Sequence, residues 1–185
     1  MTPDLPAIEA CLWPRGRSAD VWMILDGARD RRIYGALLDT YLNCSCLYSG
    51  PLAPELELAA PYLVQLEYEE RDTRRLIGRA WGNSWGVFLR CDAAMAKLRR
   101  HLRSFLIVRD ARGGRLVFRY YDPRVLRAYL PTCTREELRT VYGPIGCFWA
   151  EDAAGEHLLE FRFDGSRLAA GESPVVQPAE VGAAV

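Results

Sequence analysis

The chain has 185 residues, of which half are hydrophobic and 11% aromatic, so it can build an ordinary core in one domain or two small lobes. Its 24 basic and 24 acidic residues balance to zero, unlike the strongly basic composition of many nucleic-acid-binding proteins. The apolar runs are too short for a membrane helix, and the first residues lack a secretory signal pattern, so we expect a cytoplasmic protein without a membrane partner.

In chain order, the first half alternates between strands and helices. The run Val21–Asp26 is nearly all apolar, which is typical of a buried strand. Apolar residues then recur at helical spacing between residues 30 and 42. The full set of expected elements is an irregular or short helical lead-in over 1–20, strands over 21–26, 47–48, 62–66 and 87–90, and helices over 30–42, 73–82 and 92–103.

The second half continues this alternation and ends in a tail without aromatic residues. We expect strands over 105–109, 116–120, 145–150 and 157–163, a hairpin-like turn over 111–114, and helices over 123–130 and 135–142. The pattern favours an α/β fold with a mixed sheet. We expect one domain over 21–165, with a soft division into two lobes allowed near 49–60, and a disordered tail over 166–185.

The charges are unevenly distributed along the chain. Residues 71–127 contain 14 arginines and one lysine against four aspartates, a net charge of +11, and the rest of the chain carries −11. The acidic flanks neutralise the basic middle inside the fold, or the middle forms a surface for an acidic protein, or it binds nucleic acid. The third interpretation is the weakest, because no nucleic-acid-binding motif is visible.

The cysteines give no sign of a metal or redox site. Cys44 and Cys46 lack the two-residue gap of common zinc pairs, and no second pair accompanies them. We therefore expect reduced thiols, no metal and no cofactor. The six cysteines are Cys11, Cys44, Cys46, Cys91, Cys133 and Cys147.

Asp122 and Pro123 join an aromatic strand to a helix. Asp is a preferred N-cap residue, and Pro fits the first helical position because its missing N–H costs nothing there. Alternation along the strand places Val117, Arg119 and Tyr121 on one face. We expect Phe118, Arg119, Tyr120, Asp122 and Pro123 to be structural, and Asp122 to be a cap rather than a catalytic acid. A second helix start follows, where Thr134 and Glu137 have capping-box spacing.

The stretch from Trp81 to Gly86 is the second structural motif. Gly82 and Gly86 each follow a tryptophan, Trp81 or Trp85. Glycine lets the backbone turn or approach a neighbour closely while the indoles pack. We expect this motif to shape the fold.

These motifs together resemble the DUF4123 family over roughly residues 21–163. The resemblance rests on Trp81-Gly-x-x-Trp-Gly86, Phe88-Leu89, Leu98-Arg-Arg-His-Leu-Arg103, Val117-Phe-Arg-Tyr-Tyr-Asp-Pro-Arg-Val-Leu126, Leu130-Pro131 and Gly143-Pro144. The family is similar to adaptor chaperones of the bacterial type VI secretion system, which bind a toxic effector and help load it onto the VgrG spike. The resemblance implies a non-catalytic protein whose partners are an effector and VgrG.

An adaptor works through its surfaces, so we look for charged and aromatic side chains that a partner contacts. Arginine and tyrosine are enriched where proteins bind each other. The candidates are Arg99, Arg100, Arg103, Arg124, Arg127, Tyr121 and Tyr129. The competing interpretation is that Arg119 and Tyr121 lock the strand–helix junction internally.

Two other functional classes stay open from the residues alone. An enzyme would need a shared cleft for groups such as Asp26, His101 and a cysteine, but no spacing in the sequence supports one. A nucleic-acid-binding module would use the arginines and would bind in a strongly salt-dependent way.

Overall fold

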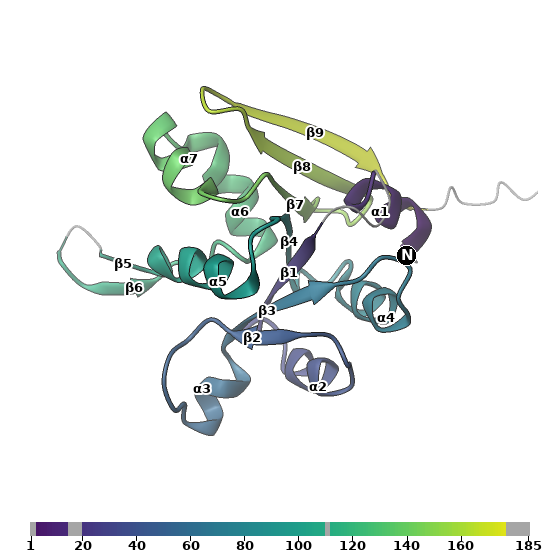
Figure 1. Cartoon of the computed structure of the whole chain (residues 1–185), viewed down its shortest axis with the longest axis horizontal. Coiled ribbons are helices and arrows are strands. Elements are labelled where there is room, and N and C mark those ends of the chain that lie inside the picture. The colour runs from purple at the N-terminus through teal and green to yellow at the C-terminus, as the bar shows by residue number, and fades with distance from the viewer. Residues whose placement is uncertain (1–2, 15–19, 110–111, 177–185) are drawn as a thin grey trace, which may run out of the picture.

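Seven strands form one central sheet in the order β2-β3-β1-β4-β7-β8-β9, and β5 and β6 form a separate two-stranded sheet (Figure 1). The structure, a computed structural model, describes residues 3–14, 20–109 and 112–176. The strands are β1 (Val21–Asp26), β2 (Cys44–Cys46), β3 (Pro61–Leu66), β4 (Gly86–Arg90), β5 (Ile107–Arg109), β6 (Arg115–Val117), β7 (Cys147–Glu151), β8 (His157–Phe163) and β9 (Leu168–Pro174). The helices are α1 (Leu5–Leu12), α2 (Arg32–Leu38), α3 (Pro54–Leu58), α4 (Arg71–Ala80), α5 (Met95–Ser104), α6 (Pro123–Tyr129), the 3-10 helix η2 (Leu130–Thr132) and α7 (Arg135–Tyr142).

Helices cover both faces of the central sheet. Val21, Met23 and Leu25 of β1 pack in one apolar cluster with residues of α1, α2 and α4. Trp22 and Ile24, which alternate with them, pack in a second cluster with residues of α5, α6 and α7. Every residue of β1 is therefore buried, which explains its nearly continuous apolar sequence and confirms the predicted buried strand.

The expected α/β class, with helices and strands alternating along the chain, is confirmed. The mixture of parallel and antiparallel strands is wrong, because each described pairing in the central sheet is antiparallel. When a helix connects two strands, neighbouring strands of the sheet can be parallel or antiparallel, because the order of the strands in the sheet decides their relative direction. Here β1 lies between β3 and β4 and runs opposite to both.

The segment 49–60 joins two strands of the same sheet. It includes the short helix α3, and β2 and β3 on either side of it pair with each other. The division into two lobes near this segment stays a prediction.

Both ends of the described chain are tied to the fold. The predicted disordered tail is wrong for Leu168–Pro174, which forms β9 and pairs along the whole of β8. Beyond it, Asp4 N–H donates to the carbonyl of Val175, which joins the two ends of the chain. The lead-in contains α1, whose Ile8 and Leu12 are fully buried. The last part of the predicted tail, 177–185, lies outside the described residues.

The capping box predicted at α7 is confirmed. Thr134 Oγ1 accepts from the Glu137 N–H at 3.3 Å, and the Glu137 carboxylate accepts from the Thr134 N–H at 2.7 Å. We expect Thr134→Ala to lower the free energy of unfolding by about 1 kcal/mol, because one free N–H of the first turn loses its partner. Urea denaturation measures this loss. Thr140→Ala, later in the same helix and also exposed, is the control and should change stability by less than about 0.5 kcal/mol. Equal losses in the two variants would contradict the capping role.

Candidate functional site

The two sequence motifs meet at one end of the central sheet. Because β1 is antiparallel to β4, and β4 to β7, the end of β1, the start of β4 and the end of β7 lie side by side. These positions are Asp26, Gly86 and Glu151. Gly86 belongs to one motif, and Asp26 and Glu151 each contact a motif, so this end of the sheet is the first place to look for a site.

Asp26 is fully buried and pairs with Arg119. The guanidinium donates from Nε at 3.0 Å and from Nη2 at 2.5 Å, both to Asp26 Oδ2. Oδ1 of the same carboxylate is buried and has no hydrogen-bond partner among the described residues. Burial raises the pKa of Asp26, and the hydrogen bonds and charge of Arg119 only partly offset this rise. The pair links the central strand to the Asp-Pro motif, as the internal interpretation of Arg119 predicts.

Asp122 is the N-cap of α6, as predicted. Its Oδ1 accepts from the Arg124 N–H at 2.9 Å, and its two oxygens also accept from the Arg124 guanidinium. Burial alone would raise the pKa of Asp122, but the hydrogen bonds and charge of Arg124 hold it below its usual value. Pro123 occupies the start of the helix and is buried. Asp122 therefore has a structural role here.

The aromatic strand before this cap is shorter than predicted. β6 ends at Val117, and the chain turns where the Asp122 N–H donates to the carbonyl of Arg119. Alternation therefore stops, and Tyr120 and Tyr121 are both buried. The Tyr120 hydroxyl donates to the carbonyl of Leu102, which connects this turn to α5.

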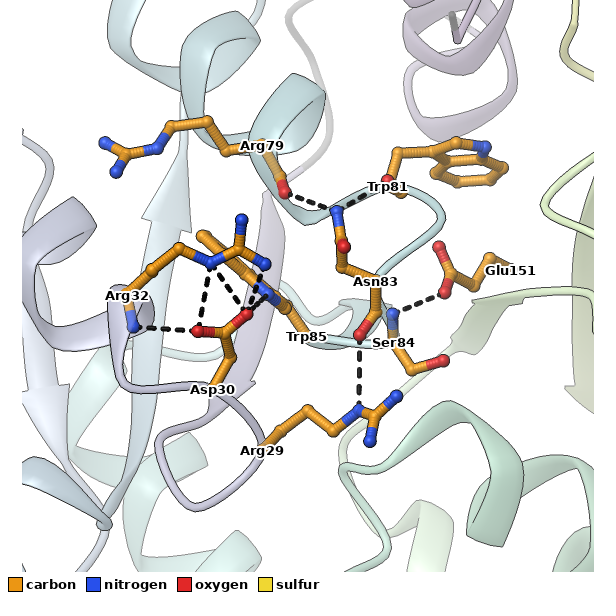
Figure 2. A network of polar contacts seen from close by, with 9 residues as sticks. All are labelled: Arg29, Asp30, Arg32, Arg79, Trp81, Asn83, Ser84, Trp85 and Glu151. Carbon is orange, nitrogen blue, oxygen red and sulfur yellow. Dashed lines mark hydrogen bonds and ion pairs between the residues drawn. The ribbon is translucent and has the colours of Figure 1, made fainter. Parts of the chain in front are cut away.

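The side chains of two tryptophans hold the loop before β4, and Figure 2 shows the contact of one of them, Trp85, with Asp30. Trp81 Nε1 donates to the carbonyl of Gly155 at 2.8 Å, and Trp85 Nε1 donates to Asp30 at 3.1 Å. Gly82 has a φ of +74°, a left-handed conformation that favours glycine, so the turn predicted there is confirmed. The Trp-Gly motif therefore stabilises the conformation of this loop.

Glu151, at the end of β7, fixes the same loop. Its two carboxylate oxygens accept from the backbone N–H groups of Gly82 at 2.6 Å and Ser84 at 2.7 Å, and Figure 2 shows the second contact. Burial raises the pKa of Glu151, while these N–H groups act in the opposite direction. No local pattern in the sequence points to this residue, because it is an isolated glutamate 67 positions after Ser84.

A family model described as a domain of unknown function (DUF4123) matches residues 21–140. The chain belongs to the DUF4123 family. The match includes both motifs at this end of the sheet, whereas Gly143-Pro144 lies beyond it. Comparisons with curated proteins and with solved structures found no match. None of the described helices is long and apolar enough to cross a membrane.

Three of the five candidate arginines of this DUF4123 chain hold its own backbone or side chains. Arg99 donates to the carbonyls of Cys46 and Tyr48, at 2.7 and 2.9 Å. Arg124 pairs with Asp122, and Arg127 donates to the carbonyl of Glu151. These contacts use all three side chains within the fold, but only Arg124 is paired with a carboxylate.

Arg100 and Arg103 differ from the other candidates. Both lie on α5, and neither makes a side-chain hydrogen bond or ion pair within the described part of the chain. Arg100 is exposed and Arg103 is half-buried. They are the two predicted arginines that a partner can reach without breaking a contact seen here.

The two candidate tyrosines are used in packing. Tyr121 is buried, so its prediction as an anchor for a partner is wrong. Its position follows from the turn at Arg119, which directs two consecutive aromatic rings inward. Tyr129 is half-buried, and its ring packs edge-on against Phe118 with 4.7 Å between the ring centres.

The residues that an enzyme site would have to bring together make separate contacts instead. Asp26 binds Arg119, whereas His101 Nε2 lies 2.9 Å from the carbonyl of Val141 and its ring packs against Phe105. The buried Cys147 lies beside Glu160, with burial the main reason that its thiol pKa is raised. No group of three or more His, Cys, Asp or Glu side chains within 3–14, 20–109 and 112–176 has an arrangement suited to a metal ion.

Proposed function

We propose that this DUF4123 chain is an adaptor that binds a type VI secretion effector in the cytoplasm and helps load it onto the VgrG spike. In this proposal the protein performs no chemistry, and its partners are proteins rather than nucleic acid or membrane. It must hold one partner until delivery, so its working parts are surfaces.

The observation that supports this proposal best is that exposed apolar residues lie apart from the side-chain contacts that hold the end of the sheet together. The motif residues Trp81, Trp85, Arg119 and Asp122 hold the sheet end together through the contacts described above. Among the described residues, the exposed large apolar ones lie at two places: β5–β6, and the region of α2 and α3. Exposed apolar groups often mark places where a protein binds another protein.

The exposed apolar residues of α3 have acidic neighbours, whereas α2 begins beside two exposed arginines, Arg31 and Arg32. Leu56 and Leu58 on α3 are exposed, and Glu55 and Glu57 lie beside them in the sequence. Tyr41, after α2, is fully exposed. The β5–β6 group lies in the basic part of the chain. Two surfaces of different charge suit a protein that contacts an effector and a spike at the same time.

Charge reversal at Arg100 and Arg103 tests whether α5 belongs to a basic surface that binds a partner. We expect the double variant Arg100→Glu with Arg103→Glu to weaken capture of an effector or VgrG by about tenfold, because both arginines can attract an acidic partner and neither stabilises the fold through a contact seen here. The measurement is binding of purified chain to effector and VgrG candidates from neighbouring genes.

Two control variants separate binding from folding. Arg139→Glu changes an exposed arginine on α7 and should leave capture unchanged. Arg99→Glu should lower the melting temperature, because it removes the bonds to Cys46 and Tyr48. Unchanged capture by the Arg100 and Arg103 double variant would remove α5 from the binding surface. Failure of the wild-type chain to bind any candidate would contradict the adaptor role, and salt-dependent binding to DNA or RNA would favour the nucleic-acid alternative.

A further inference from the structure

β5 and β6 form a short two-stranded ribbon, Ile107–Arg109 with Arg115–Val117, that stands apart from the central sheet. Figure 1 shows it extending away from the sheet beyond α5. All six residues are exposed, although four of them are apolar. Such a ribbon is only marginally stable alone in water, so burial against another surface would stabilise it.

The apolar residues lie on both faces of the ribbon. Ile107 is opposite Val117, with 41% and 44% exposure, and Val108 is opposite Leu116, with 36% and 51% exposure. Because neighbouring residues of a strand point to opposite faces, each face carries one apolar pair. In the described part of the chain, neither pair is covered enough to be buried.

The outer edges of the ribbon are also open. The Phe118 N–H donates to the carbonyl of Leu106 at 2.8 Å, so residues 106 and 118 form a hydrogen-bonded pair. Pairs alternate in an antiparallel ladder, and therefore Ile107 and Val117 direct their backbone N–H and C=O groups outward. The ribbon has two strands in the described structure, so neither edge pairs with a further strand there. An open edge is a template for another strand.

The charge of the ribbon identifies the kind of strand that fits. Arg109 lies directly opposite Arg115, and like charges at opposed positions destabilise a strand pair. Neither arginine makes an ion pair with a carboxylate of the described residues; Arg109 donates to the carbonyl of Gly113 instead. A second copy of the ribbon would bring four arginines together, whereas a carboxylate from a partner would relieve the repulsion.

We propose that the β5–β6 ribbon binds an extended segment of a partner protein, in which two consecutive apolar residues adjoin a carboxylate, as a third strand. An antiparallel segment along β6 places its apolar residues beside Val117 and Leu116 and its carboxylate beside Arg115. The β5 edge carries the same residue types in the opposite chain direction, in Ile107–Arg109, so the same segment would run parallel to β5. The partner's identity as effector or spike rests on the proposed adaptor function; the chemistry of the segment does not.

A peptide titration tests the chemistry without any cargo protein. The probe is acetyl-Thr-Thr-Val-Leu-Glu-Thr-Thr-amide, and the matched control has Lys in place of Glu. In two-dimensional NMR spectra of the full chain, the Glu peptide should shift the amides of 106–109 and 115–118 and bind about tenfold more tightly than the Lys peptide. Equal binding of both peptides, no shift, or shifts confined to other regions would overturn the proposal.

Two ribbon variants sharpen the test. Arg115→Glu places a carboxylate opposite Arg109, which stabilises the ribbon while reversing its preference, so the Lys peptide should then bind about tenfold more tightly. Leu116→Thr keeps a residue that favours strands but removes apolar surface, and should weaken binding of the Glu peptide about tenfold. An unchanged preference in Arg115→Glu would overturn the charge argument. Dimers of the wild-type chain that dissociate in Arg115→Glu would identify a second copy as the occupant and overturn it too.

Cargo capture separates this inference from the proposed function. Wild-type capture of an effector or VgrG, lost in Arg115→Glu and Leu116→Thr, would identify that partner as the ribbon's occupant. Capture that both variants retain would overturn the ribbon as the cargo contact while the adaptor function stands. A peptide response at the ribbon without capture of any candidate would support the ribbon chemistry and contradict the adaptor function.

Discussion

Gly86→Ala should lower the free energy of unfolding by about 3 kcal/mol, the upper part of the range for overpacked interiors. A Cβ at position 86 would lie 2.0 Å from the carbonyl oxygen of Ile24, a backbone atom of the neighbouring central strand. Backbone atoms move less easily than side-chain ends, so β1 and β4 would have to separate locally. A loss of this size corresponds to a melting temperature lower by about 6–12 °C.

Gly78→Ala is the matched control for this prediction. Gly78 lies inside α4, and a Cβ there would have Leu5 Cδ1, at 3.9 Å, as its nearest neighbour. Alanine has the higher helix propensity, so this variant should be more stable than the wild type by about 0.5–1 kcal/mol. Urea unfolding followed by tryptophan fluorescence measures both. A Gly86→Ala protein as stable as the wild type would contradict the close approach of the two strands.

Short sequence patterns correctly predicted the features that depend mainly on neighbouring residues. The buried run Val21–Asp26 became β1, and the Thr134–Glu137 box starts α7 as the spacing predicts. Asp122 caps α6 for the same reason, because N-cap preference depends on neighbouring N–H groups and not on the rest of the fold. Such features can be predicted from a few adjacent residues.

Pairing between distant segments was not predictable in this way. β9 contains Ala, Gly, Ser and Pro and has little intrinsic preference for a strand. It forms because β8 offers an edge along its whole length, a property of the folded sheet. The antiparallel direction of β1 against β3 and β4 likewise depends on which strands become neighbours.

In the candidate site, too, local features were predictable from the sequence and contacts between distant residues were not. The sequence predicted that Arg119 and the Trp-Gly motif are structural, but it gave no partner for either one. Asp26 lies 93 positions from Arg119, and Glu151 lies 69 from Gly82, so neither contact has a local pattern. The hairpin turn before β6 was predicted, whereas the exposure of both ribbon faces depends on the absence of a covering element in the described structure.

Arg119→Met should lower the free energy of unfolding by about 2–3 kcal/mol at pH 7, less than for a fully buried pair, because the Arg119 side chain is 38% exposed. The substitution keeps an unbranched side chain of similar length but removes both hydrogen bonds to Asp26. Asp26 would then be a fully buried carboxylate without a compensating charge. Removing the partner of a buried carboxylate costs more than the ion pair itself contributes, because the remaining charge stays desolvated.

The double variant Arg119→Met with Asp26→Asn separates loss of the ion pair from loss of packing. Asparagine is close to aspartate in size but carries no charge, so it removes the stranded carboxylate that makes the single variant unstable. We expect the double variant to regain more than half of the lost stability. If it is as unstable as Arg119→Met, packing of the arginine stem rather than charge is responsible.

The pH dependence of this loss identifies its cause. Burial raises the pKa of Asp26 in the folded state above its unfolded value, so the folded state binds the proton more tightly and stability falls as pH rises between the two pKa values. Arg119 lowers the folded pKa, so removing it raises that pKa further and widens the window. The difference in unfolding free energy between wild type and Arg119→Met should therefore be large at pH 7 and shrink towards pH 4, where Asp26 is protonated in the variant. Urea unfolding of both proteins across this range measures it, and a difference that does not change with pH would show that the arginine acts through packing alone.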